Sequence, residues 1–162
     1  MATPTTKSFE LRGADGSPLR GEVRTGGGAR PALVVWPALP AATERLARAG
    51  FTVIAVALPA AAHDVDVVLD GLRAGQLGPA PSGVAVLGHG AGGREAASRA
   101  ARSGRVTATV IWTPSPPGGD AARATAAGEQ LMLTVPAPWQ AGHPEFERAL
   151  AETTRWLATR LA

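Results

Sequence analysis

The stretch VAVLGHGAGG, residues 84–93, decides how this 162-residue chain is interpreted. Its first part is an apolar run of the kind that forms a buried strand, and its second part is a turn rich in glycine. Residues 91–104 continue as a helix that ends at Gly104, a favoured residue at a helix C-terminus. A strand that runs through a glycine turn into a helix is typical of sites where backbone N–H groups, or one raised side chain, face a ligand.

Apolar runs and helical segments alternate on both sides of this stretch. The expected strands are 31–36, 51–58, 82–88, 105–112 and 129–135. The expected helices are 41–50, 63–75, 91–104 and 144–161. Strands that are apolar on both faces and alternate with helices are typical of a parallel sheet that helices cover on both sides. The sequence therefore predicts an α/β fold, a three-layer sandwich around a mostly parallel, twisted sheet.

An antiparallel hairpin is expected before this alternation begins. Residues 7–12 and 18–24 flank the turn 14–17, which contains Asp15-Gly16. Asp-Gly between two short runs is a hairpin signal, and Pro18 favours an edge strand or the first position of a strand. We expect this hairpin at the N-terminal edge of the sheet, within a single domain that covers residues 1–162.

The amino-acid composition argues against several classes of function, namely metal binding, nucleic-acid binding and membrane insertion. The chain has no cysteine and only three histidines, which excludes thiolate ligands and argues against a metal site. Fifteen of the 16 basic residues are arginines scattered along the chain, so the net charge of +3 does not indicate nucleic-acid binding. The longest nearly apolar run, 51–62, is too short to cross a membrane, and the N-terminus lacks the apolar core of a signal peptide. We expect a cytoplasmic protein that uses no cofactor, metal, nucleic acid or membrane.

The glycine turn fits two known patterns. Gly88, Gly90 and Gly93 match the dinucleotide-binding pattern G-x-G-x-x-G, in which helix N–H groups receive a pyrophosphate. That pattern requires an acidic residue at the end of the next strand, and residues 111–114 contain none. The turn also follows the third expected parallel strand rather than the first. The second pattern, the nucleophile elbow G-x-S-x-G, fits the surroundings better, with Gly90 in place of the serine.

Four segments together resemble an α/β-hydrolase, most closely the dienelactone-hydrolase branch. They are ADGSPLRGEVRTGGGARPALVVW (14–36), ERLARAGFTVIAVALP (44–59), VAVLGHGAGG (84–93) and LMLTVPAPWQAGHPEFERALAETTRWLATRL (131–161). The resemblance implies a minimal α/β-hydrolase fold whose site combines the turn at 88–93 with an acid and a histidine. It also implies that His143, between the last strand and the last helix, corresponds to the family's histidine.

Two departures from the family affect its chemistry. Gly90 stands at the nucleophile position and has no side chain, so an acyl-enzyme cannot form there. A strand–helix unit is missing before His143, and the family's acid is missing with it. Asp120 is the nearby substitute in the family's order of nucleophile, acid and histidine. We favour the simpler interpretation of Asp120 as a loop aspartate, or as the N-cap of a helix over AARATAAG (121–128).

The remaining candidates surround the turn. The N–H groups around Gly90 to Gly92 are expected to face a carboxylate, a phosphate or a polarised carbonyl. His143 is either a general base that faces the turn or a histidine that packs at the start of the last helix. The expected binding residues are Gly88, His89, Ala91, Gly92, Trp36, Pro37 and Trp112. For the tryptophans near strand ends, Trp139 included, core packing is the simpler explanation.

Four functions remain open at this point. The leading hypothesis is a pseudo-enzyme that has lost the nucleophile and the acid and binds a small acyl, ester or lactone-type molecule. An alternative is a non-covalent lyase, cyclase or isomerase that uses His143 as a base and the Gly90–Gly92 backbone as an oxyanion hole. A third is an ordinary ester or lactone hydrolase in which Gly90 replaces a serine. A fourth is a structural subunit that forms a homodimer through an exposed sheet edge.

Overall fold

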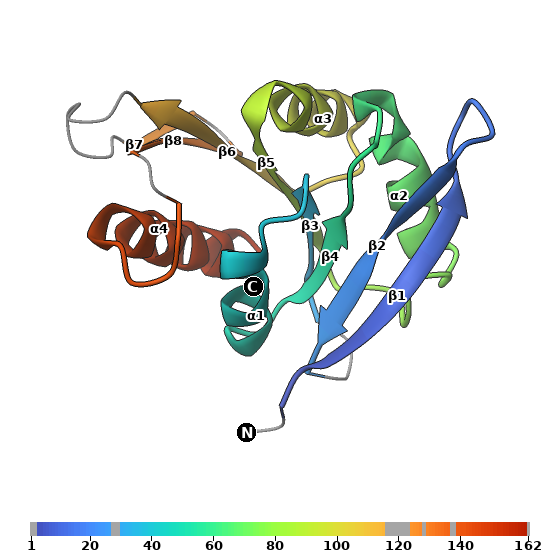
Figure 1. The fold of residues 1–162 in the computed structure, drawn as a ribbon, viewed down its shortest axis with the longest axis horizontal. Helices are drawn as coiled ribbons and strands as arrows, with labels where there is room; N and C mark the ends of the chain where they lie inside the picture. Colours follow the sequence, from blue (N-terminus) through green and yellow to red (C-terminus); the bar gives the residue numbers. More distant parts are fainter. Residues whose placement is uncertain (1–2, 27–29, 116–123, 128, 137–138, 162) are drawn as a thin grey trace.

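One twisted sheet lies between two layers of helices (Figure 1). The computed structural model describes residues 3–26, 30–115, 124–127, 129–136 and 139–161. Within this part of the chain, no helix is long and apolar enough to cross a membrane. The α/β class and the three layers predicted from the sequence are confirmed.

The sheet contains eight strands among the described residues, in the order β1-β2-β4-β3-β5-β6-β8-β7. Their bounds are β1 (Thr5–Arg12), β2 (Pro18–Thr25), β3 (Ala32–Trp36), β4 (Thr52–Val56), β5 (Val84–His89), β6 (Ala108–Ser115), β7 (Ala124–Ala127) and β8 (Gln130–Pro136). The five central strands run parallel, and β1, β2 and β7 add antiparallel pairs at the two sides. The carboxyl ends of all five central strands therefore meet at one edge of the sheet.

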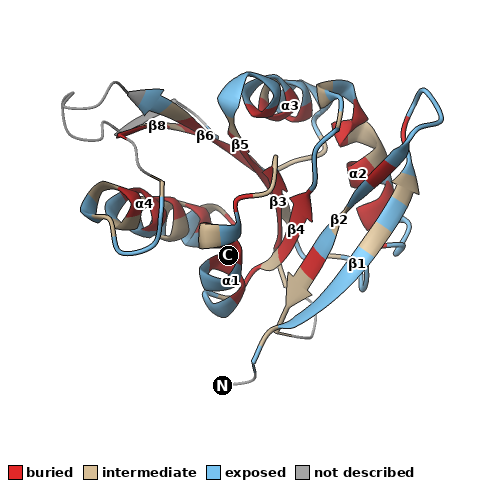
Figure 2. Ribbon diagram, viewed as in Figure 1, coloured by how far each residue is buried: buried red, intermediate tan, exposed pale blue. Residues whose placement is uncertain are grey.

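The helices divide between the two faces of the sheet. The first face carries α1 (Pro40–Arg48) and α4 (Pro144–Arg160). The second carries α3 (Gly90–Ser103) and α2 (Val65–Arg73), which the short 3-10 turn η1 (Ala62–Asp64) precedes. Alternate residues of the central strands contact the two layers, and every residue of β3 is buried. Figure 2 shows this contrast, since β3 is buried along its length while β1 is largely exposed.

The N-terminal hairpin forms where the sequence predicts it. Arg12 pairs with Pro18 at the end nearest the turn, and Pro18 is the first residue of its strand. In the turn, the Ser17 N–H donates to the Asp15 carboxylate at 2.9 Å, and Gly16 has a φ of +86°. Asp-Gly therefore supplies the side-chain acceptor and the left-handed backbone that this connection needs.

The segment after β6 differs from the sequence-based expectation of a helix over 121–128. Residues 124–127 form β7, which pairs antiparallel with β8 at the outer side of the sheet. The chain thus inserts β8 between β6 and β7, and β7 becomes the edge strand. Alanine and threonine dominate this segment, and Ala is the best helix former. Tertiary pairing with β8 overrides that local preference. Asp120 lies outside the described residues.

Two glycines allow α3 to pack closely against the sheet. A Cβ added to Gly88 would lie 2.0 Å from the Gly93 carbonyl oxygen, and one added to Gly93 would lie 2.2 Å from the Trp36 carbonyl oxygen. Backbone therefore meets backbone at both positions, with no flexible side chain that could move aside. The first turn of α3 rests directly on the carboxyl ends of β3 and β5.

A methyl group at either glycine should destabilise the fold strongly. We expect Gly88→Ala and Gly93→Ala each to lower the free energy of unfolding by about 2 kcal/mol or more, because overpacking against rigid backbone forces the helix outward. Gly92→Ala is the matched control, since a Cβ there meets no atom within 4 Å. The control should be neutral or more stable by about 0.5–1 kcal/mol. Urea denaturation measures all three, and equal stability of the three variants would contradict the close packing.

Candidate functional site

The turn between β5 and α3 has an unusual backbone at Gly90. Its φ is +71°, and among the described residues only glycines have a positive φ. A Cβ added at Gly90 would meet no heavy atom within 4 Å, so a side chain at this position would project into open space. The residue before it, His89, is fully extended at the end of β5. The turn therefore has the sharp strand-to-helix geometry of a nucleophile elbow, with no side chain at its tip.

The N-terminus of α3 presents backbone donors at this turn. Gly90, Ala91 and Gly92 are exposed, and the first N–H groups of a helix have no intrahelical acceptor. No side chain of the described residues caps this helix, and its first turn has no acidic residue. These N–H groups and the positive end of the helix dipole favour a negatively charged or polarised oxygen.

His89 supports the turn as a neutral side chain. Its Nε2 lies 2.8 Å from the Pro37 carbonyl oxygen, which can only accept, so Nε2 carries the hydrogen. Burial lowers the pKa of His89 below its ordinary value of 6.5, and the bond to Pro37 only partly opposes this shift. The ring also meets the Trp139 ring edge-on, with 5.4 Å between centroids. His89 thus ties the loop after β3 and the segment after β8 to the turn.

A chain of edge-on aromatic contacts continues from Trp139 into the core. Trp139 packs on Trp112 with 5.7 Å between centroids, and Trp112 packs on Phe146 of α4 with 5.9 Å. The Trp112 Nε1 donates to the Thr153 hydroxyl at 3.0 Å. Because Trp112 and Trp36 are 0% and 1% exposed, these two rings offer no surface to a ligand. They are core residues rather than binding residues, which corrects the binding set expected from the sequence.

His143 lies immediately before α4 and is half-buried. Its Nδ1 is buried without a hydrogen-bond partner among the described residues. In a serine-type triad, the acid accepts a hydrogen bond from this nitrogen and orients the ring. In the described part of the chain, no carboxylate does so for His143.

The turn that carries His143 is held from α4 and α1. Glu147 accepts a hydrogen bond from the Gly142 N–H at 2.8 Å and forms an ion pair with Arg45 of α1. The Arg45 guanidinium, and after it the Gly142 N–H, hold the pKa of the Glu147 carboxyl below its usual range. The hydrogen bond and the ion pair of Glu147 thereby hold the backbone next to His143.

The sheet register shows how the strands that lead into the two parts of the site are arranged. His89 pairs with Trp112, and Trp112 pairs with Leu133, so β6 lies between the strand that precedes Gly90 and the strand that precedes His143. The strands β5 and β8 are therefore about 10 Å apart, which is two strand spacings. The structure therefore brings Gly88 to Gly92, Pro37 and Trp139 together, and it places His143 on the neighbouring loop.

Thr153 and the cavities could not be inferred from the sequence. Thr153, which fixes Trp112, was not identified, because a threonine in the middle of a helix gives no sequence signal. Five cavities lined by described residues lie elsewhere, and none has Gly90 or His143 in its wall. Within the same part of the chain, no cluster of His, Asp and Glu could hold a metal ion.

Sequence comparisons identify no relative, whereas the comparison with solved structures finds chains of similar fold. No family model and no curated protein matches the chain. A zinc-bound cold-adapted esterase from an Arctic intertidal metagenomic library superposes with a TM-score of 0.67 at 14% identity, over 99% of this chain and 95% of that one. The α/β-hydrolase GrgF from Penicillium matches with a TM-score of 0.53 at 20% identity, over 67% of this chain and 45% of its own.

A third match points to the same fold. Brefeldin A esterase, described as a bacterial homologue of human hormone-sensitive lipase, has a TM-score of 0.50 and 23% identity, over 70% of this chain and 40% of its own. The chain has the α/β-hydrolase fold. It spans 23% of the AtxE2 isopeptidase and less than half of several other matched chains. The dienelactone-hydrolase branch stays a prediction from the sequence.

The lowered pKa of His89 predicts a pH dependence of stability. In the unfolded chain a histidine takes up a proton below its ordinary pKa of 6.5, whereas folded His89 stays neutral to lower pH. The unfolded state then binds more protons, so the free energy of unfolding should fall as the pH drops below 6.5 and should not depend on this group above it.

This dependence can be measured by urea denaturation between pH 7.5 and pH 5. We expect His89→Gln to flatten the decline and the control His63→Gln to retain it, because His63 is exposed. Identical slopes in the original chain and in His89→Gln would show that His89 is not the group responsible.

Proposed function

We propose that this α/β-hydrolase-fold protein performs no covalent catalysis at the elbow and binds a small acyl-type molecule there, such as a carboxylate, an ester or a lactone. Gly90 is the observation that carries this proposal. It occupies the tip of the strand-to-helix turn with a φ of +71°, in open space where a nucleophile would project. With hydrogen in place of a side chain, the reacting group is absent while the surrounding donors remain.

The backbone physics favours glycine at this position. A residue with a Cβ is strained at positive φ, and glycine is not. An elbow that no longer needs a nucleophile is therefore stabilised by glycine. The N–H groups of Gly90, Ala91 and Gly92 keep their direction, because Gly88 and Gly93 hold the helix against the sheet. Such preorganised donors stabilise an oxyanion or bind a carboxylate.

The state of His143 also supports binding rather than hydrolysis. Its Nδ1 has no acceptor among the described residues, so no acid in that part of the chain fixes the tautomer and orientation that a general base needs. A non-covalent enzyme that uses His143 as a base is the second candidate. Its support is the half-buried imidazole on the loop next to the elbow, and the experiment below separates the two candidates.

Hydrolysis of p-nitrophenyl acetate tests the catalytic part of the proposal. We expect the original chain to show neither a burst nor turnover above that of the control His63→Ala. Gly90→Ser should not increase the rate by more than about tenfold, because a serine–histidine pair without its oriented acid loses a factor of about 10⁴.

Two results would contradict this expectation. Turnover of the original chain that disappears in His143→Ala would establish the non-covalent enzyme. Efficient hydrolysis with a burst in Gly90→Ser would mean that the remaining machinery is intact, and that the chain is a hydrolase in which glycine has replaced serine.

Removal of one N–H group tests the binding part. In nucleophile elbows, the N–H of the residue after the nucleophile contributes to the oxyanion hole, and Ala91 occupies that position. Because Gly90 is left-handed, Ala91 is the first right-handed residue of α3, where proline is well tolerated. Ala91→Pro should weaken the binding of butyrate about tenfold or more, while Ala91→Ser keeps the N–H and binds normally.

Amide chemical shifts of ¹⁵N-labelled protein measure this binding. Butyrate should shift the resonances of Gly90, Ala91 and Gly92 in the original chain. Absence of butyrate shifts at Gly90, Ala91 and Gly92, or equal affinity of Ala91→Pro and Ala91→Ser at these resonances, would refute binding at the elbow.

A further inference from the structure

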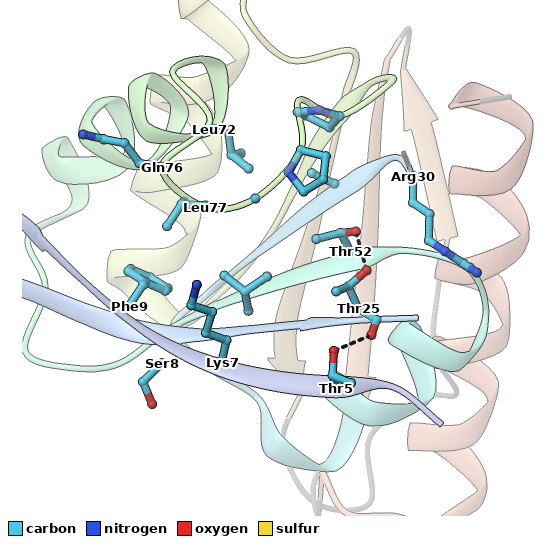
Figure 3. A pocket seen from close by; sticks show the side chains of 15 residues that line it. Thr5, Lys7, Ser8, Phe9, Thr25, Arg30, Thr52, Leu72, Gln76 and Leu77 are labelled. Atoms are coloured by element: carbon cyan, nitrogen blue, oxygen red, sulfur yellow. Dashed lines mark hydrogen bonds between the residues drawn. The ribbon is translucent and has the colours of Figure 1, made fainter. Parts of the chain in front are cut away.

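One cavity lies at the opposite end of the sheet from Gly90. Its walls include Thr5 at the start of β1, Thr25 at the end of β2, and Ala32 and Thr52 at the starts of β3 and β4. The segment 76–81, which follows α2, closes the other side (Figure 3). The enclosed volume is about 240 Å³. This site is independent of the elbow, because parallel strands place their amino and carboxyl ends at opposite edges of the sheet.

The body of the cavity is apolar. Val23, Leu72 and Leu77 are buried core residues that also line it, and the half-buried Phe9 stands beside them. Pro79 and Pro81 complete the wall on the side of the segment 76–81. A concave site of this kind favours an apolar ligand body, because the ligand removes apolar wall from water. At about 30 Å³ per water-sized group, the volume suits an apolar ligand body of about eight non-hydrogen atoms.

One cation faces this apolar space. Lys7 is the only lysine in the chain, and it pairs across the hairpin with Val23, so both side chains lie on the same face of the sheet. In Figure 3 its ammonium points into the cavity beside Phe9. Among the described residues, no carboxylate forms an ion pair with Lys7, and the cavity wall contains no Asp or Glu.

Further polar groups lie at the floor and at the outer end of the cavity. The hydroxyls of Thr25 and Thr52 lie 3.0 Å apart at the floor, where a hydroxyl can rotate to donate to an anion. The Arg30 side chain extends toward Gly26 and Gly50 at the outer end, so it adds positive charge without filling the cavity. The charge in the wall is therefore entirely positive.

We propose that this cavity binds a small amphipathic carboxylate, with the apolar body between Phe9, Leu72 and Leu77 and the carboxylate at the Lys7 ammonium. An apolar wall selects the hydrocarbon part, and a single unpaired ammonium at its margin selects the anionic head. A neutral molecule would leave the ammonium without a counter-charge. An anion without an apolar part would leave the apolar wall in contact with water.

Isothermal titration with octanoate tests the proposal. In the Ala91→Pro variant, which removes the elbow N–H, octanoate should bind with one-to-one stoichiometry, and octan-1-ol should bind at least about tenfold more weakly. Lys7→Gln should weaken octanoate about tenfold or more and leave octan-1-ol unchanged. Arg12→Gln is the matched control, because it removes one positive charge from the same strand at a residue outside the cavity wall. It should bind octanoate normally.

Amide chemical shifts locate the ligand and separate this site from the elbow. Octanoate should shift Val23, Leu72 and Leu77, and Ala91→Pro should not affect those shifts. Absence of octanoate binding, equal binding of octanoate and octan-1-ol, or unchanged affinity in Lys7→Gln would each overturn the proposal. Octanoate shifts confined to Gly90, Ala91 and Gly92 would also overturn it, while they would support binding at the elbow. Failure at one site therefore leaves the other site's test intact.

Discussion

The contact between two backbones at Gly88 and Gly93 is the constraint on which the rest of the molecule depends. With no Cβ at either position, the first turn of α3 lies directly on the ends of β5 and β3, where the Trp36 carbonyl meets Gly93. Because the helix packs so closely, the chain turns sharply between β5 and α3. Gly90 accepts the left-handed conformation that this turn requires. The N–H groups at the start of α3 consequently face outward over the carboxyl edge of the sheet.

The two edges of the sheet carry different chemistry. At the carboxyl edge, backbone donors combine with a neutral His89 and edge-on aromatic rings, so the positive character comes from the helix itself. At the amino edge, a side-chain cation stands over an apolar cavity. The first arrangement suits a polarised oxygen close to backbone, and the second suits an anion with a hydrocarbon body. Parallel strand direction keeps these two regions apart.

Only two strands, β7 and β8, follow β6 in the described part of the sheet. β7 pairs antiparallel with β8, and Trp139 then returns the chain across the sheet to contact Trp112 and His89. An esterase of nearly equal length superposes over almost the whole chain, so this short form of the fold is not peculiar to this protein. The alanine-rich segment 121–128 predicted a helix in place of β7. Local propensity does not include the hydrogen bonds with β8, which join residues from two different strands.

The sequence by itself determined the parallel core, the hairpin and the glycine turn, because each depends on local signals: apolar runs, Asp-Gly, and a glycine-rich stretch between a strand and a helix. Only the tertiary structure decided which side chains face a ligand. Trp36 and Trp112 lie in the core, Trp139 packs on His89, and the Lys7 ammonium faces an apolar cavity built from four separate segments of the chain. These contacts depend on the order of the strands and on the placement of the helices across the sheet. Both bring together residues that are far apart along the chain, so the sequence alone does not predict the contacts.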